Sequence, residues 1–241
     1  MTKELLKQRF TKSLKTYQQN AIVQKQMAEK LTQNVLGSNF DDILELGCGT
    51  GFVTEILNEH CRFNNYDAID IVNGCKSFIE KISNNINFIN TDIEDFSTQK
   101  KYNLIISNAS LQWLEDFEQF IKKIKSNLKE DGIFLFTLFG ENNFKELKAI
   151  TGKTLEYYST DTLTNILNNY SIKTISEETI TLTFKTPKDV LYHIKNTGVN
   201  AIAQEHWTKS DLIRFEQDYY KLCDKNITLT YNPIYIEVKQ K

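Results

Sequence analysis

A glycine-rich stretch at residues 43–51 constrains this chain more than any other feature. It reads Ile-Leu-Glu-Leu-Gly-Cys-Gly-Thr-Gly and stands where an apolar run gives way to an amphipathic one. Glycines between a first strand and a first helix permit a tight turn and let the backbone come close to a ligand. A dinucleotide fingerprint needs G-x-G-x-x-G, but here the third glycine comes one residue early and Phe52 occupies its slot. The spacing therefore argues against a nicotinamide-binding oxidoreductase.

Short apolar runs alternate with amphipathic runs around this motif. We expect strands at residues 42–46, 65–71, 87–89, 102–108 and 133–138, and helices at residues 50–60, 74–83 and 117–128. This alternation predicts an α/β fold with a parallel, doubly wound sheet and helices on both faces. Ligands of such sheets bind at the carboxyl ends of the strands, near the point where the strand order reverses.

The two flanks of this core have a different pattern. The first 40 residues have near-helical apolar spacing, and Gly37 suits the end of that stretch. Residues 178–185 and 227–238 alternate like strands, and we expect them to complete the sheet as a hairpin-like pair. The sequence thus predicts one domain over residues 1–241, with a helical cap (1–40), a ligand-binding core (41–140) and a helical lid insertion (187–226).

The composition limits which binding partners and which cellular compartment we expect for this protein. The net charge of -2 gives no global field that would favour nucleic acid. We find no signal peptide and no apolar run near the ~20 residues that a membrane span needs, so we expect a cytoplasmic protein with no membrane partner. The four cysteines (Cys48, Cys61, Cys75 and Cys223) have neither C-x-x-C nor zinc-finger spacing. We therefore expect reduced thiols and no metal.

Polar residues end three of the expected strands. Asp70 ends the second strand, Asp92 follows the third and Asn108 ends the fourth. A carboxylate about 20 residues after the glycine turn can accept hydrogen bonds from ribose hydroxyls, and one after the third strand can accept from an adenine amino group. Each acid alone could instead cap the next helix. A glycine turn followed by all three residues in this order is a more specific signal than any one of them.

On these residues the chain resembles the class I S-adenosylmethionine-dependent methyltransferases over about residues 40 to 140. The resemblance implies a Rossmann-like sheet of seven strands with the last strand antiparallel. It also implies S-adenosylmethionine as the cofactor, S-adenosylhomocysteine as the product, and no metal. The cofactor-binding residues that it implies are Gln24, Glu45, Gly47, Cys48, Gly49, Gly51, Asp70, Ile71, Asp92, Ile93 and Asn108.

A narrower resemblance extends over nearly the whole chain. Sequence blocks within residues 9–31, 107–113, 139–147, 193–201 and 231–235 are similar to the malonyl-acyl carrier protein O-methyltransferases of biotin synthesis. This implies methyl transfer to the free carboxylate of a malonyl thioester, with the acidic acyl carrier protein as partner. Two alternatives stay open. One is a methyltransferase for another small carboxylic acid or a quinone precursor, and the other is a non-catalytic methyltransferase-like binding protein.

The implied reaction needs orientation rather than a general base, because a carboxylic acid is already ionised at neutral pH. Tyr17, His193 and Lys195 are the candidates for substrate orientation. His193 and Lys195 are two residues apart on an expected helix, so one of them should face solvent. A basic segment could dock the carrier protein or could be a solvated helix face: Lys3, Lys7, Arg9, Lys12 and Lys15. We expect Lys122, Lys123, Lys125 and Lys129 to be solubility charges on one flanking helix.

Overall fold

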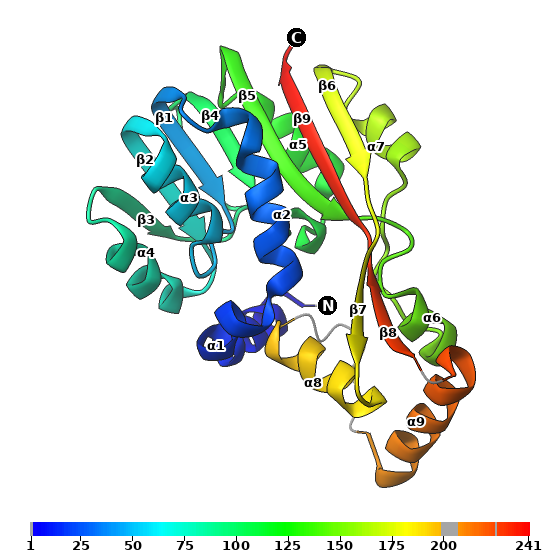
Figure 1. The fold of residues 1–241 in the computed structure, drawn as a ribbon. Helices are drawn as coiled ribbons and strands as arrows, with labels where there is room; N and C mark the ends of the chain where they lie inside the picture. The colour runs from blue at the N-terminus through cyan, green and yellow to red at the C-terminus, as the bar shows by residue number, and fades with distance from the viewer. Residues whose placement is uncertain (1, 199–206, 225) are drawn as a thin grey trace. The chain divides into compact units, whose positions relative to one another are not determined.

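The structure is a computed structural model that describes residues 2–198, 207–224 and 226–241 (Figure 1). The chain divides into two compact units, each made of three separate stretches. We call Gln24–Leu138, Ser159–Glu177 and Ile234–Lys241 the sheet unit, and Met1–Val23, Phe139–Tyr158 and Glu178–Pro233 the helical unit. The division into segments 1–40, 41–140 and 187–226 stays a prediction.

The sheet unit is built on one seven-stranded sheet with the order β3-β2-β1-β4-β5-β9-β6. Four neighbouring pairs are parallel, namely β1 with β2, β1 with β4, β2 with β3 and β4 with β5, whereas β9 is antiparallel to β6. The strands are β1 (Asn39–Leu46), β2 (Arg62–Asp70), β3 (Ile86–Asn90), β4 (Tyr102–Ser107), β5 (Leu128–Phe139), β6 (Tyr170–Glu177) and β9 (Pro233–Gln240). The expected doubly wound sheet with an antiparallel last strand is confirmed.

Helices cover both faces of this sheet, with α2 and α3 in front of it and α5 behind it in Figure 1. In α5, the Asp116 side chain accepts from the Gln119 backbone N–H at 2.8 Å and fixes the first turn. Phe120, Ile121 and Ile124 form the buried face of that helix. The helices of this unit are α2 (Ile22–Thr32), α3 (Phe52–His60), α4 (Lys76–Ile82), α5 (Phe117–Lys125) and α7 (Thr160–Ile166), with 3-10 turns at Gln33–Val35, Asn73–Cys75 and Leu111–Trp113.

Within its described residues, the helical unit combines four helices with a small sheet. Its elements are α1 (Lys3–Asn20), α6 (Lys145–Thr151), β7 (Ile180–Phe184), α8 (Pro187–Asn196), α9 (Lys209–Cys223) and β8 (Ile227–Tyr231). The start of α8 is fixed by a capping box between Thr186 and Asp189. Helix α1 lies against the end of α8, because the Thr16 hydroxyl donates to the Asn196 carbonyl at 3.3 Å. No helix in the described parts of the chain is long and apolar enough to cross a membrane.

The expected hairpin-like pair forms, but it does not join the main sheet as a pair, so that part of the prediction is wrong. Residues 180–184 and 227–231 pair as β7 and β8 in a separate two-stranded sheet, while β6 and β9 extend the main sheet. Asn232 separates β8 from β9 because its backbone hydrogen-bonds to residues outside both strands. Its N–H donates to the Asn143 side chain at 3.2 Å, and its carbonyl accepts from Gly140 N–H at 2.7 Å. Helices occupy residues 187–196 and 209–223 of the expected insertion, and residues 199–206 lie outside the described residues.

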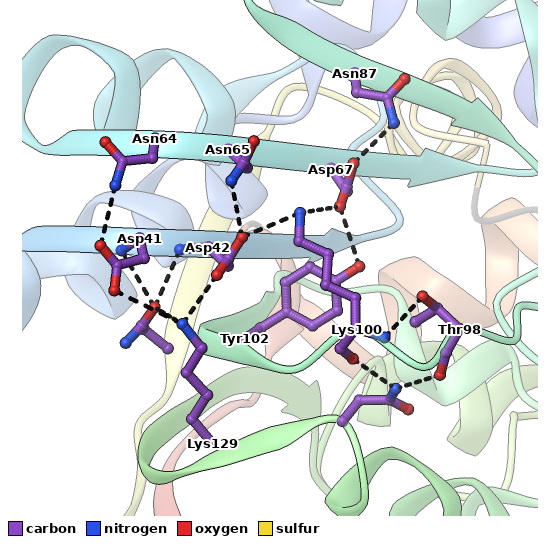
Figure 2. Close-up of polar contacts among 12 residues, drawn as sticks. Asp41, Asp42, Asn64, Asn65, Asp67, Asn87, Thr98, Lys100, Tyr102 and Lys129 are labelled. Carbon is purple, nitrogen blue, oxygen red and sulfur yellow. Dashed lines mark hydrogen bonds and ion pairs between the residues drawn. The ribbon is translucent and has the colours of Figure 1, made fainter.

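The expectation for Lys129 is also wrong. Helix α5 ends at Lys125, and Lys129 lies near the start of β5. Its Nζ is 2.9 Å from Asp42 Oδ2, and the Nζ of Lys100 lies 2.9 Å from Asp67 Oδ2 and 3.2 Å from Asp42 Oδ1. Figure 2 shows this ion-pair network around the amino ends of β4 and β5. Lys129 therefore neutralises a largely buried carboxylate and is not a solubility charge.

Candidate functional site

The glycine motif forms the loop between β1 and α3. Gly47, Gly49 and Gly51 all have left-handed backbone conformations, with φ of 72°, 54° and 91°. A Cβ at Gly47 would lie 2.0 Å from Ser110 Oγ, so only glycine lets the loop pack against the turn that follows β4. A Cβ at Gly49 would meet no atom within 4 Å. The loop therefore presents backbone to open space at Gly49, where a ligand can approach closely.

Asp70 lies at the carboxyl end of β2 and holds this loop in place. One carboxylate oxygen accepts from Gly49 N–H at 2.8 Å, and the other accepts from Val72 N–H at 2.8 Å. Burial raises the pKa of Asp70, against the lowering effect of these two hydrogen bonds and of a third from the Cys75 side chain. The carboxylate has lone-pair capacity beyond these three bonds, so Asp70 can also accept from a ligand hydroxyl.

Glu45 is buried near the end of β1, with an exposed fraction of 2%. The hydroxyls of Thr54 and Tyr66 both donate to its Oε2, at 2.6 and 2.5 Å. Burial raises the pKa of Glu45 to about 7. A cationic group near Glu45 would lower that pKa again, so this carboxyl is suited to respond to a positively charged ligand.

The remaining predicted residues of the cofactor set lie on loops at the carboxyl ends of the strands. Asp92 follows β3, and its Oδ1 accepts from Glu94 N–H at 2.9 Å. Ile93 is buried, and its side chain is 3.6 Å from where a Cβ on Gly47 would lie. Ile71 directly follows β2 and is half-buried. The Cys48 thiol is buried within the glycine loop, and burial raises its pKa.

Asn108 and Gln24 meet on one side of this loop. Asn108 Nδ2 donates to the Gln24 backbone carbonyl at 2.9 Å, which links the end of β4 to α2. Asn108 Oδ1 accepts from the Thr137 hydroxyl at 2.8 Å. Gln24 is 2% exposed, and its Oε1 has no hydrogen-bond partner among the described residues. A buried acceptor without a partner is costly, so this atom is suited to a donor brought by a ligand.

All of the predicted cofactor-binding residues thus lie in the sheet unit, between Gln24 and Asn108. Together they provide an open glycine backbone at Gly49, a carboxylate at Asp70 and the unused acceptor at Gln24. This set fits a nucleoside that carries ribose hydroxyls and a cationic amino group. Among the described residues, no cluster of His, Cys, Asp or Glu side chains could hold a metal ion.

The three predicted substrate residues lie in the helical unit. His193 is buried on α8, and its Nε2 is 2.7 Å from the Tyr231 hydroxyl. Burial lowers the pKa of His193 to about 4, so its imidazole is neutral at pH 7. Lys195 is exposed, as the two-residue spacing from His193 suggested. Tyr17 is half-buried on α1, and its ring centroid lies 6.4 Å from that of Phe10.

Tyr231 and Thr137 were not identified from the sequence as polar partners of the predicted site residues. Tyr231 lies within a block that carried the narrower resemblance, but strand alternation does not show that its hydroxyl bonds to His193. Thr137 could have been found as a hydroxyl in the otherwise apolar run of residues 133–139. Its two partners come from a turn 28 and 29 residues away in the sequence. Local spacing says nothing about contacts of that kind.

The basic segment of α1 is not one uniform patch. Lys12 and Lys15 are exposed, whereas Lys3, Lys7 and Arg9 are half-buried. Residues three apart on a helix are neighbours on its surface, so Lys12 and Lys15 form the exposed pair.

Comparison with known proteins places these observations in a family. A family model described as "Methyltransferase domain" matches residues 18–177. The malonyl-[acyl-carrier protein] O-methyltransferase of Calditerrivibrio nitroreducens is 38% identical over 239 residues, covering 97% of this chain and 96% of the relative. Proteins of the same name from Chlorobium luteolum and Porphyromonas gingivalis are 34% and 36% identical. Those alignments cover 99% and 98% of this chain and 96% and 95% of the relatives.

Solved structures share the fold at much lower identity. The YcgJ protein from Bacillus subtilis matches with a TM-score of 0.63 and 13% identity, over 89% of this chain and 98% of that one. The N-methyltransferase NodS from Bradyrhizobium japonicum, in complex with S-adenosyl-L-homocysteine, matches with a TM-score of 0.52 and 15% identity, over 90% of this chain and 85% of that one.

Proposed function

Because the chain belongs to the malonyl-[acyl-carrier protein] O-methyltransferases, we propose that it transfers a methyl group from S-adenosylmethionine to the free carboxylate of malonyl-acyl carrier protein. The product is the malonyl methyl ester, which serves biotin synthesis. The observation that carries this proposal is 38% identity over 97% of this chain and 96% of a relative of that name. The geometry of the glycine loop and its acceptors supports the same function, because it fits the cofactor.

On the cofactor side, the proposal gives the predicted residues of the sheet unit separate roles. Asp70 would accept from the ribose hydroxyls, Asp92 and Ile93 would hold the adenine, and the backbone of Gly49 would allow close approach. Glu45, Gln24 and the Asn108 carbonyl would hold the amino group of the methionine portion. Gly47, Cys48, Gly51 and Ile71 shape the loops that carry these groups.

The chemistry needs little from acid or base groups. When bound, S-adenosylmethionine supplies an electrophilic methyl group on a positively charged sulfur. The malonyl carboxylate is ionised at pH 7 and is a nucleophile without any proton transfer. The residues of this chain therefore contribute by aligning the carboxylate with the methyl group and by excluding water.

On the substrate side, we assign orientation to Tyr17, His193 and Lys195. A neutral His193 can hold a hydrogen-bonded neighbour without placing a full positive charge on the carboxylate, which would weaken it as a nucleophile. Its bond to Tyr231 fixes the imidazole. Positive charge for the acidic carrier protein comes from the basic segment of α1, namely Lys3, Lys7, Arg9, Lys12 and Lys15.

Mass spectrometry of intact malonyl-acyl carrier protein, incubated with this protein and S-adenosylmethionine, tests the proposed function. We expect the gain of one methyl group, and no gain with acetyl-acyl carrier protein, which lacks the free carboxylate. No gain on the malonyl form, with cofactor binding intact, would reject this substrate. Methylation of both forms would show that the carboxylate is not the acceptor.

A further inference from the structure

One buried hydroxyl joins the carboxyl ends of β4 and β5. Thr137 lies on β5 with an exposed fraction of 0%. Its Oγ1 donates to Asn108 Oδ1 at 2.8 Å and accepts from Ala109 N–H at 2.8 Å. The hydroxyl thus makes one hydrogen bond as a donor and one as an acceptor, and both partners belong to the turn that follows β4.

That turn has a backbone conformation that needs support. Ala109 has φ of 50°, in the left-handed region that alanine rarely adopts. The Ala109 N–H is held by Thr137, and the Ala109 carbonyl accepts from Gln112 Nε2 at 2.7 Å. Strained backbone of this kind persists where its surroundings over-determine it, and it is common at ligand sites.

The same hydroxyl also orients the Asn108 side chain. With Oδ1 held by Thr137, the amide presents Nδ2 to the Gln24 carbonyl at 2.9 Å. Both ends of the amide are therefore held by other residues of the protein. Gln24, at the other end of this connection, is buried, and its Oε1 has no hydrogen-bond partner in the described parts of the chain.

We propose that Thr137 is a positioning residue of the cofactor site, whose hydroxyl fixes the turn at Asn108 and Ala109 and, through Asn108, the place of Gln24. The methionine portion of S-adenosylmethionine then meets acceptors that are already in position, so less ordering is required on binding. Thr137 acts through these neighbours. The inference rests on the proposed function, because it takes the sheet unit to bind that cofactor.

Two substitutions separate the hydroxyl from the shape of the side chain. Thr137→Val removes the hydroxyl and keeps the branched shape, whereas Thr137→Ser keeps the hydroxyl and removes a methyl group. By calorimetry on the full chain, we expect Thr137→Val to weaken S-adenosylhomocysteine binding about tenfold or more. We expect Thr137→Ser to stay within about twofold of the unsubstituted protein. An unchanged affinity of Thr137→Val, or an equal loss in both variants, would overturn the proposal.

A matched control and a double-mutant cycle distinguish positioning from general stability. Thr230→Val removes another buried strand hydroxyl, which donates to Glu146, so it should lower the unfolding midpoint without changing cofactor affinity. If Thr137 acts through Asn108, then Thr137→Val should add little further loss to Asn108→Ala. Fully additive losses, or a loss of cofactor affinity in Thr230→Val equal to that in Thr137→Val, would contradict the role assigned to Thr137.

Hydrogen exchange keeps the inference testable if Thr137→Val does not fold. In the cofactor-free unsubstituted protein, the Ala109 amide should be protected from exchange, because Thr137 already holds it. If the Ala109 amide exchanged as fast as an amide in an open loop, the turn would not be preformed and the proposal would be overturned. An unsubstituted protein that binds no S-adenosylhomocysteine would overturn the proposed function and this inference together. Binding that is insensitive to Thr137→Val would overturn the inference alone.

Discussion

At the scale of single residues, Asp70 connects the glycine loop to the proposed cofactor site. Its carboxylate accepts hydrogen bonds from the backbone N–H groups of Gly49 and Val72, and the proposed function adds ribose hydroxyls as donors. Removing the carboxylate should therefore loosen the glycine loop and also remove its hydrogen bonds to the cofactor.

We expect Asp70→Ala to weaken cofactor binding by about 1–3 kcal/mol, because hydrogen bonds to a charged acceptor are lost. Isothermal calorimetry with S-adenosylhomocysteine measures this directly. Asp41→Ala is the matched control, since Asp41 is an exposed acid in β1. Equal affinities of Asp70→Ala and the unsubstituted protein would defeat the assignment of Asp70.

The raised pKa of Glu45 predicts the direction in which the free energy of unfolding changes with pH. Its pKa rises from 4.5 to about 7 on folding, so the folded protein binds the proton more tightly than the unfolded chain does. The stability from this group is fully present below about pH 4.5 and is lost as the pH rises through about 7. Over this pH range, the free energy of unfolding of the unsubstituted protein should fall by on the order of 3 kcal/mol relative to that of Glu45→Gln.

Urea unfolding of both proteins between about pH 4.5 and 8 measures this difference. Glu55→Gln, at an exposed position on α3, serves as the control and should run parallel to the unsubstituted protein. A constant gap between the unsubstituted protein and Glu45→Gln across the range would show that Glu45 does not titrate there.

At the scale of elements, α1 gives the clearest test of carrier-protein docking. Reversing the exposed pair with Lys12→Glu and Lys15→Glu should raise the KM for malonyl-acyl carrier protein about fivefold at low salt. The effect should fade in about 0.5 M salt, because screening weakens contacts between exposed charges. The KM for S-adenosylmethionine should not change.

Steady-state kinetics of this double variant need a control of equal charge. Lys101→Glu with Lys122→Glu makes the same change at exposed positions outside α1. An equal rise in KM for the control pair would mean that net charge, rather than docking on α1, is responsible. An unchanged KM in the Lys12 and Lys15 variant would remove α1 from the docking surface.

The elements of the core were predictable because each carries its own pattern. Short apolar runs separated by amphipathic runs predicted β1 to β4, and the glycine motif predicted the turn into α3. The terminal strands were not predictable in the same way. We expected residues 227–238 to form one strand, but the apolar alternation changes phase at Asn232-Pro233, and the structure divides the segment there. The Asn-Pro pair is a local turn signal, whereas the bonds of the Asn232 backbone to Gly140 and Asn143 leave no local signal.

At the scale of the whole chain, the network in Figure 2 contributes to the response of stability to acid. Burial alone would raise the pKa of Asp42, but hydrogen bonds from Lys129 and Lys100 outweigh it and hold that pKa below its ordinary value. A lowered carboxyl pKa gives stability that is present above the ordinary value and lost as the pH falls. This network therefore adds to acid unfolding.

Lys129→Met should lower the free energy of unfolding by about 1–2 kcal/mol at neutral pH, because Asp42 then loses one of the two lysines that pair with it among the described residues. Urea denaturation measures this loss of free energy, with the substitution Lys101→Met at an exposed position as the control. The deficit should shrink at about pH 3, where Asp42 is protonated in the unfolded chain. A deficit that does not depend on pH would assign the loss to packing of the lysine side chain.

The position of β9 has a consequence for how the protein is made. Pro233–Gln240 leaves the ribosome after β5 and β6, yet it lies between them in the sheet. Until this segment emerges, the nascent chain has two open strand edges, one on β5 and one on β6, which other chains could occupy. Strands β1 to β4 can pair earlier, so the sheet can close between β5 and β6 only after Pro233–Gln240 has been made.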